Sequence, residues 1–184
     1  MLARLLLGLM LALGGPAVSG CARSAEPATA PTPTAATQFG GTDLAWIEIN
    51  IAMDEQLLPL LGLVPSRSGS AGVQAVASQV QAVTTAELTE LRALHDQAGL
   101  PSANPHEGMP MPGMVTPDDV AKAQSLTGKE FDAFVVKAIE AHVEQSQNLA
   151  ESEDKSGVEP QTRTLALQVL RTRAEVMSTI NSIS

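Results

Sequence analysis

Apolar residues recur at helical spacing through four long stretches of the chain, with polar residues between them. A period of about 3.6 residues is typical of an amphipathic helix, so we predict helices over about 42–61, 73–97, 129–152 and 160–183. The positions predicted to face inward are Leu44, Trp46, Ile47, Ile51, Met53, Leu57, Leu58, Leu60, Val73, Val76, Val80, Leu91, Leu94, Phe131, Val135, Ala138, His142, Leu149, Leu165, Val169, Val176 and Ile180. Since every long periodic stretch is helical, we predict an all-α domain.

Capping residues indicate where several of these helices begin or end. Thr42 and Asp43 are both suitable N-caps for the first helix, because each side-chain oxygen can accept a backbone N–H. Gly99 is placed to end the second helix, since glycine readily adopts the left-handed conformation that follows many helices. Thr116, followed by Pro117 and two acidic residues, is a strong helix start and predicts a short additional helix before the third long one.

The first two long helices resemble the last two. Asp132 follows Asp43 by 89 residues, and Glu175 follows Glu87 by 88 residues, each in a similar local sequence. A single helical hairpin would leave its apolar face in water, so we predict a four-helix bundle built from two repeated hairpins. Both glutamates are either buried partners of inward polar groups or ordinary exposed helix residues. The half-repeats cover about 42–100 and 117–184.

The first 20 residues have the three parts of a secretory signal peptide. Arg4 supplies a positive charge, residues 5–13 are apolar, and small residues precede Cys21. The apolar run is about half the ~20 residues that a membrane-spanning helix needs. The ending Val-Ser-Gly-Cys resembles the lipobox of bacterial lipoproteins, in which the cysteine receives a diacylglycerol and becomes the first mature residue. We predict a signal peptide over 1–20 and a lipidated Cys21. A secreted protein with an unmodified cysteine is the alternative.

Residues 21–41 combine the predicted lipid anchor with a segment dominated by Pro, Thr and Ala. Such a composition predicts a disordered or polyproline linker, in which Phe39 is the one residue that could dock on a core. The helical domain then occupies 42–184. Because two acyl chains hold a protein on a bilayer far better than one, we expect Cys21 to attach this domain to the extracytoplasmic face of the bacterial cell membrane.

Composition and charge exclude several functions. The chain has 184 residues, a formal net charge of −9 and one cysteine. An acidic chain is a poor nucleic-acid binder, and a single cysteine permits neither a disulfide framework nor a zinc site with several thiolates. The sequence has no glycine-rich phosphate loop, no nucleophile motif and no Glu-x-x-His pair for a di-iron centre, so we predict that the protein is not an enzyme. It indicates no particular protein partner or oligomeric state.

The densest chemical feature is the segment that joins the two half-repeats, residues 106–116, which we call the bridge. It contains Met109, Met111 and Met114 within six positions, separated by prolines and glycine, and it begins with His106. Soft thioethers at this spacing can converge on one Cu(I) ion, with the imidazole as a further donor. The alternative is a linker whose methionines cover the end of the bundle.

The chain resembles domain-of-unknown-function family 305. The resemblance rests on the Asp-opened helices, the Ala-Glu-Leu and Ala-Glu-Val sequences around Glu87 and Glu175, and the stretch Met-Pro-Met-Pro-Gly-Met-Val-Thr-Pro that starts at Met109. It implies a ferritin-like helical bundle, exported or lipid-anchored, in a family with some members associated with copper binding. It covers roughly residues 42–183.

The resemblance also implies a His-His pair about ten residues after each opening aspartate. Here the pairs are replaced by Met53-Asp54 and by His142-Val143, so one of four imidazoles is present. An inward His142 is either a core histidine or a ligand shared with Met53 or Asp54. Two hypotheses follow. In the first, the protein is a lipoprotein that binds copper through the bridge, with or without His142. In the second, it is a metal-free envelope module that has lost the family's histidines.

Overall fold

The computed structural model describes residues 38–183, which form six helices and no strand. The helices are α1 (Gly41–Leu61), α2 (Val64–Arg67), α3 (Ala71–Ala98), α4 (Pro117–Ser125), α5 (Gly128–Ser156) and α6 (Pro160–Ile183). This confirms the prediction of an all-α domain. None of the helices in this part of the chain is long and apolar enough to cross a membrane. The predicted signal peptide, Cys21 and most of the predicted linker lie outside the described residues.

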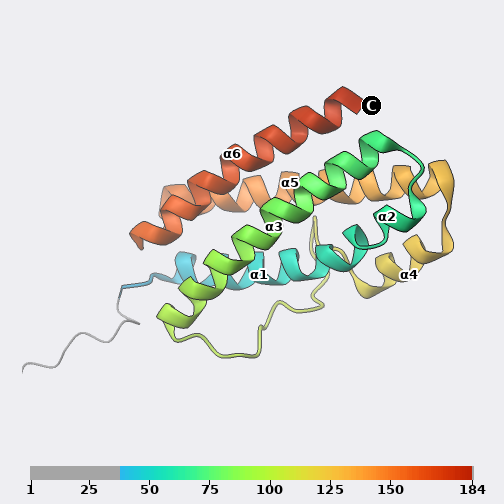
Figure 1. The fold of residues 1–184 in the computed structure, drawn as a ribbon. Helices are drawn as coiled ribbons and strands as arrows, with labels where there is room; N and C mark the ends of the chain where they lie inside the picture. Colours follow the sequence, from blue (N-terminus) through green and yellow to red (C-terminus); the bar gives the residue numbers. More distant parts are fainter. Residues whose placement is uncertain (1–37, 184) are drawn as a thin grey trace, which may run out of the picture. The chain divides into compact units, whose positions relative to one another are not determined.

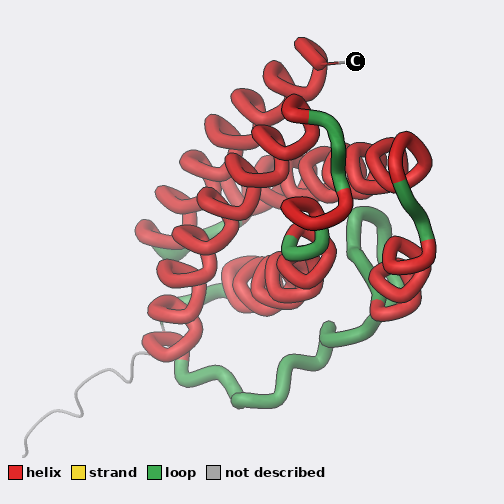
Figure 2. The backbone as a smooth tube through the Cα atoms, turned by 45° about the vertical axis from the view of Figure 1, so that its right-hand side comes forward, coloured by secondary structure: helices red, strands yellow, loops and turns green. Residues whose placement is uncertain are grey.

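The four long helices pack as two antiparallel pairs, α1 with α3 and α5 with α6 (Figure 1). The pairs also meet mainly through α1 with α5 and α3 with α6, so each long helix packs chiefly against two neighbours. Helix α4 lies against α1 and α5, and α2 lies against α3 and α5. The connection from α3 to α4 contains the bridge and is the longest irregular segment of the described chain (Figure 2).

Capping explains most of the helix ends. Gly40 is the N-cap of α1, and Asp43 completes a capping box by accepting the Gly40 N–H, whereas we had predicted Thr42 or Asp43 as the cap itself. Gly99 ends α3 in the left-handed conformation with φ 66°, as predicted. Thr116 and its third following residue form the capping box predicted for α4. The α5 helix continues about one turn beyond its predicted end.

The core consists of two large apolar clusters and one small one. The large clusters fill the two halves of the domain between the long helices. Most positions predicted to face inward are buried, although Leu44, Leu58, Ala138 and Leu149 are only partly covered. Phe39 packs in one large cluster beside Trp46, so the residue that could dock does so. The small cluster lies where the bridge meets α1.

The bridge is held on the domain at two points. The Asn104 side chain, just before the bridge, donates from Nδ2 to the Glu48 carbonyl of α1 at 2.7 Å. Gly113 has φ +74° and lies so close to α5 that a Cβ there would be 2.6 Å from the Ala141 carbonyl oxygen. Only glycine combines this backbone conformation with this approach. Met114, next in the chain, is thereby placed against α1.

Candidate functional site

Three methionine side chains belong to the small apolar cluster where the bridge crosses α1. Met53 of α1 is fully buried, Met114 is 7% exposed, and the half-buried Met111 packs against the cluster that these two form with Ala52. The Gln56 side chain donates from Nε2 to the Met114 Sδ at 3.1 Å. We call Met53, Met111 and Met114 the thioether cluster. Two of its members were predicted from the bridge, and Met53 was predicted from the family resemblance.

Two other candidate ligands of the bridge lie elsewhere. Met109 is 44% exposed and belongs to none of the buried clusters of the described residues. His106 lies half-buried in a turn, where its backbone N–H donates to the Asn104 side chain at 2.9 Å. Within residues 38–183, no hydrogen bond joins the His106 ring to the thioether cluster, and His106 is not among the residues that pack on it. The bridge methionines therefore divide into two that meet α1 and one that faces solvent.

His142 lies on α5 beside the bridge and is fully buried. Its Nε2 is 3.4 Å from the Asp54 Oδ1, and neither ring nitrogen has a hydrogen-bond partner in the described part of the chain. Burial, followed by the charge of Arg173, lowers the pKa of His142 to about 3, although Glu87 and the backbone of Gly113 act in the opposite direction. The ring is therefore neutral near pH 7, the form that can donate a lone pair to a metal.

Behind His142 lies a buried polar group that the sequence analysis did not foresee as a unit. Arg173 of α6 is fully buried and donates from Nη2 to the Glu87 Oε2 of α3 at 2.7 Å. The same Nη2 is 3.7 Å from the Asp54 Oδ1 of α1, and the Arg173 Nε donates to the Ser146 Oγ of α5 at 3.1 Å. We call Asp54, Glu87, His142, Ser146 and Arg173 the polar centre. All four long helices contribute to it.

The two acids of the polar centre share one cation. Burial raises the pKa of Asp54 to about 7, against the opposing effect of Arg173. Burial and the nearby Asp54 raise the pKa of Glu87 to about 7 as well. Because a buried site avoids net charge, we expect Arg173 to neutralise one carboxylate while the other carries a proton near neutral pH. The centre is then electrically balanced without any added ion.

A second acidic contact lies at the far end of α5. The fully buried Asp43 accepts backbone N–H groups from Gly40 at 2.6 Å, Val158 at 3.0 Å and Glu159 at 3.1 Å. Burial raises its pKa, but the neighbouring Glu153 and these hydrogen bonds outweigh burial and lower it below the usual value. Burial and the Asp43 carboxylate raise the pKa of Glu153 to about 8. This pair fastens the start of α1 to the α5–α6 connection.

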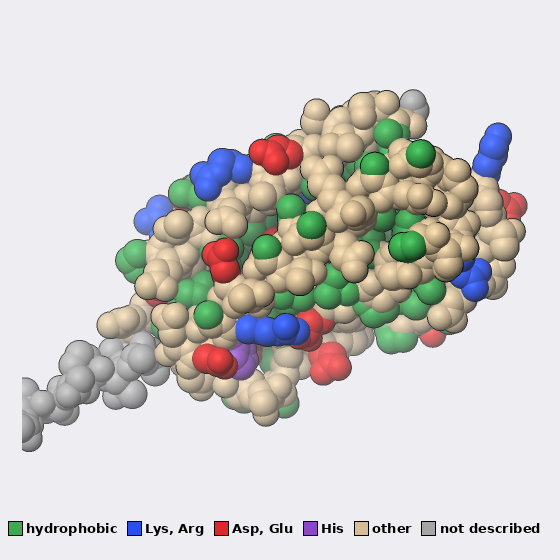
Figure 3. Space-filling view, viewed as in Figure 1, with side chains coloured by type: hydrophobic (Ala, Val, Ile, Leu, Met, Phe, Trp, Pro, Cys, Tyr) green, Lys and Arg blue, Asp and Glu red, His purple; other side chains and the backbone are tan. Residues whose placement is uncertain are grey.

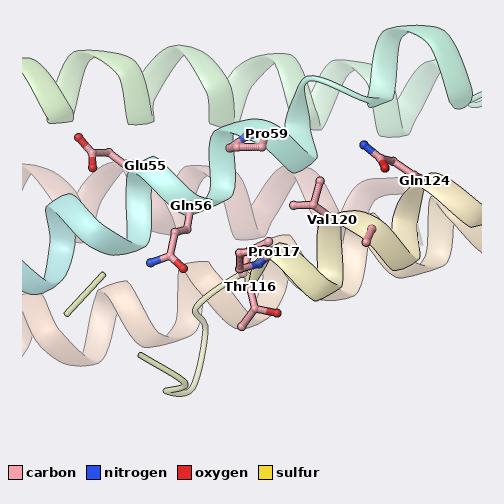
Figure 4. Close-up of a pocket in the computed structure, with 9 residues that line it drawn as sticks. Glu55, Gln56, Pro59, Thr116, Pro117, Val120 and Gln124 are labelled. Carbon is pink, nitrogen blue, oxygen red and sulfur yellow. The ribbon is translucent and has the colours of Figure 1, made fainter. Parts of the chain in front are cut away.

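Two cavities flank the buried part of the bridge. One, of about 320 Å³, lies between α1 and α4 and is lined by Gln56, Val115 and Thr116 among others (Figure 4). The other, also about 320 Å³, lies between α4 and α5 and is lined by Gly113 and Met114. Figure 4 shows Gln56 projecting from α1 on the side where Thr116 and Pro117 begin α4, with its amide turned away from them. Met114 therefore borders a cavity through which a small ligand could reach it.

The comparisons with known proteins now bear on this arrangement. The model of the family described as Domain of unknown function (DUF305) matches residues 43–183, most of the chain. The chain belongs to the DUF305 family. The resemblance stated from the sequence is thus confirmed.

Two solved DUF305 structures share the fold. A crystal structure of a DUF305 fragment from Deinococcus radiodurans has a TM-score of 0.69 at 17% identity, covering 79% of this chain and 96% of that one. A DUF305 protein from Streptomyces coelicolor, named as a candidate secreted protein, has a TM-score of 0.64 at 19% identity, covering 75% and 89%. At these identities the likeness shows the fold alone. The curated proteins yielded no match.

The donor atoms determine which metals this DUF305 chain could hold. The described residues contain no group of three or more His, Cys, Asp or Glu side chains arranged to bind an ion, which disfavours metals that require several oxygen, nitrogen or thiolate ligands. The thioether cluster with His142 has a different character, since thioethers and a neutral imidazole suit Cu(I). The residues present therefore fit a soft monovalent ion at the bridge and do not fit a hard divalent ion in the polar centre.

Proposed function

We propose that this DUF305 protein is an extracytoplasmic, lipid-anchored protein that binds copper and is not an enzyme. Met53, Met111, Met114 and His142 would hold a Cu(I) ion. One observation carries the proposal: the buried, neutral His142 lies on α5 where Gly113 of the bridge meets that helix, and the bridge places Met114 in one apolar cluster with Met53. A buried histidine normally makes strong hydrogen bonds, whereas the closest side-chain oxygen to this ring is that of Asp54 at 3.4 Å, so an imidazole lone pair is free to bind a metal.

The location rests on the N-terminal sequence. Residues 1–20 have the composition of a signal peptide, and Cys21 has the position of a lipidated cysteine. The Streptomyces coelicolor relative, named as a candidate secreted protein, agrees with export. The bundle itself is proposed to be ferritin-like and to derive from duplication of one hairpin, in support of which the chain order α1–α3 and α5–α6 repeats the same pair of long helices.

The chain's own residues suit uptake of Cu(I) without a proton change. Thioethers carry no proton, and His142 is already neutral, so binding would release none. Gln56 donates to the Met114 sulfur and would have to turn away when that sulfur binds metal. The exposed Met109 and the half-buried His106 stay candidate ligands at the surface of the bridge, where an arriving ion would meet them first.

The test is a Cu(I) titration of the chain without residues 1–20, under anaerobic reducing conditions, against a coloured Cu(I) chelator. Cys21→Ser removes the single thiol, which would otherwise bind the ion itself. We expect uptake of one equivalent, lost when Met53, Met111 and Met114 are all changed to Leu. Met177→Leu, in a different apolar cluster, is the matched control and should leave uptake unchanged. Absence of uptake, or uptake that survives the triple change, would refute the proposal.

A metal-free envelope module is the second candidate function. It is favoured by Arg173, because the guanidinium already balances the charge at the place where the long helices meet. This function predicts that the melting temperature stays the same with Cu(I) present, whereas a ligand that binds only the folded chain must raise it. Thermal unfolding with and without Cu(I) therefore separates the two candidates.

A further inference from the structure

Three side chains of types that commonly bind divalent ions lie near the Arg173 guanidinium, although with Arg173 in place they are not arranged around an ion. Asp54 comes from α1, Glu87 from α3 and His142 from α5, and each is at most 4% exposed. What lies between the carboxylates is the side chain of Arg173, which is 2.7 Å from one Glu87 oxygen and 3.7 Å from one Asp54 oxygen. The guanidinium holds the position that a cation bound by these acids would take.

We infer that Arg173 is a specificity-determining residue: it is a covalently attached cation that excludes divalent metals from the polar centre, so that the described residues favour soft Cu(I) at the thioether cluster. The inference extends the proposed function by assigning its selectivity. Its test does not depend on Cu(I) binding, because the carboxylates and the thioether cluster can be probed separately.

Charge explains the exclusion. A divalent ion added beside Arg173 would place three positive charges against two carboxylates in a buried site, where like charges repel strongly. Without the guanidinium, two positive charges would face two negative ones. The ion would displace the proton that one of the two acids now carries, and both carboxylates would then balance its charge.

Unused donor atoms and space complete the site. Asp54 Oδ2, Glu87 Oε1 and both ring nitrogens of His142 have no hydrogen-bond partner among the described residues. The Ser146 hydroxyl would also lose its present donor. Arg173 is the largest fully buried side chain in the described part of the chain, so shortening it opens room for an ion with its water. Removing one side chain therefore supplies both the ligands and the volume.

The test is a Co²⁺ titration followed by visible absorption, since protein-bound Co²⁺ absorbs in a way that reports its coordination. The Cys21→Ser chain without residues 1–20 is compared with its Arg173→Ala variant. Arg171→Ala, an exposed position on the same helix, is the matched control. We expect one equivalent bound by Arg173→Ala, at least about tenfold more tightly than by the parent or the control. Adding Glu87→Gln should abolish that binding.

Several results would overturn the inference. One is a folded Arg173→Ala chain that takes up no Co²⁺. Another is a parent chain that binds Co²⁺ as tightly as the variant. If Arg173→Ala is unfolded, circular dichroism must show that Co²⁺ refolds it; Arg173→Ser, which opens the same space with a small polar side chain, provides a second variant. Failure of Co²⁺ to refold or to bind either variant also overturns it, because the ion must be able to replace the guanidinium.

The two proposals fail in distinguishable ways. If the parent chain takes up no Cu(I) but Arg173→Ala binds Co²⁺, the copper function is refuted and the role of Arg173 stands. If the parent chain takes up Cu(I) but Arg173→Ala binds no Co²⁺, the role of Arg173 is refuted and the copper function stands.

Discussion

The two hairpins place matching glutamates in opposite environments. Glu87 of α3 is buried and bonded to Arg173, whereas Glu175, its counterpart 88 residues later on α6, is exposed. The polar centre is therefore not duplicated. The first hairpin supplies its acids, Asp54 and Glu87, and the second supplies its bases, His142 and Arg173. The comparison shows that each hairpin contributes one sign of charge to the polar centre: the first supplies the carboxyl groups and the second supplies the Arg173 guanidinium.

The opening aspartates differ in the same way. Asp43 is fully buried and accepts three backbone N–H groups, two of them from the α5–α6 connection. Asp132 of α5 is half-buried, and one of its oxygens has no partner in the described residues. The start of the first hairpin is thus hydrogen-bonded to the second hairpin, and within residues 38–183 no equivalent hydrogen bond joins Asp132 to the first hairpin.

The glutamate pair gives the largest expected effect. Glu87→Ala leaves the Arg173 guanidinium buried with a single, more distant acid, and we expect a loss of about 3 kcal/mol in the free energy of unfolding. Glu175→Ala, at the exposed equivalent position, should change it by about 0.5 kcal/mol or less. Urea unfolding at pH 7 measures both. Equal losses would show that the two glutamates are equivalent after all.

The aspartate pair gives an intermediate effect. Asp43→Ala leaves buried backbone N–H groups without acceptors, which we expect to cost about 2 kcal/mol. Asp132→Ala removes a favourable charge near the start of α5, worth about 0.5 kcal/mol. The same urea unfolding series measures the difference. A loss for Asp132→Ala as large as that for Asp43→Ala would contradict this one-sided hydrogen bonding.

The connections between the helices of each hairpin differ in their response to pH, an effect that is absent when stability is compared at a single low pH. The first connection buries an apolar residue, Val64, whereas the second lies against the buried acid Glu153. The pKa of Glu153 is about 8 in the folded chain against an ordinary value of 4.5. The folded chain therefore holds an extra proton between these values, and this stabilisation is complete below the lower value and lost as pH rises through the higher one.

Glu153→Gln should remove that loss, because the amide does not titrate. Between about pH 5 and pH 8.5 we expect the melting temperature of the parent chain to fall a few degrees further than that of the variant. The raised pKa values of Asp54 and Glu87 produce a fall of the same sign in both chains, so the difference between the chains isolates Glu153. Parallel pH curves would rule out this role for Glu153.

The sequence predicts the helices well because long amphipathic periods and capping residues are local signals. The five helices longer than one turn were all expected, while the one-turn α2 was not, since a short apolar stretch beside Pro65 carries no period. Burial of His142 was also predicted from its position on an apolar face.

The polar centre could not be predicted in the same way. Arg173 lies four residues after Val169 and three before Val176, so the helical period places it inward, but that period was traced through apolar residues alone. Its partner Glu87 is 86 residues away, and no local pattern reports which charge faces another across the bundle. For the same reason the sequence could not tell that Met114 meets Met53 while Met109 faces solvent.

Between the Asn104 attachment and the packed Met111, residues 105–110 form a mostly exposed loop. The face in Figure 3 shows acidic and basic side chains scattered among other residues, with no large continuous patch of either sign. A protease that cuts the chain there would sever one peptide bond and little else. The two hairpins, produced as separate polypeptides, should therefore find each other and reconstitute the bundle, with Arg173 of one fragment meeting Glu87 of the other.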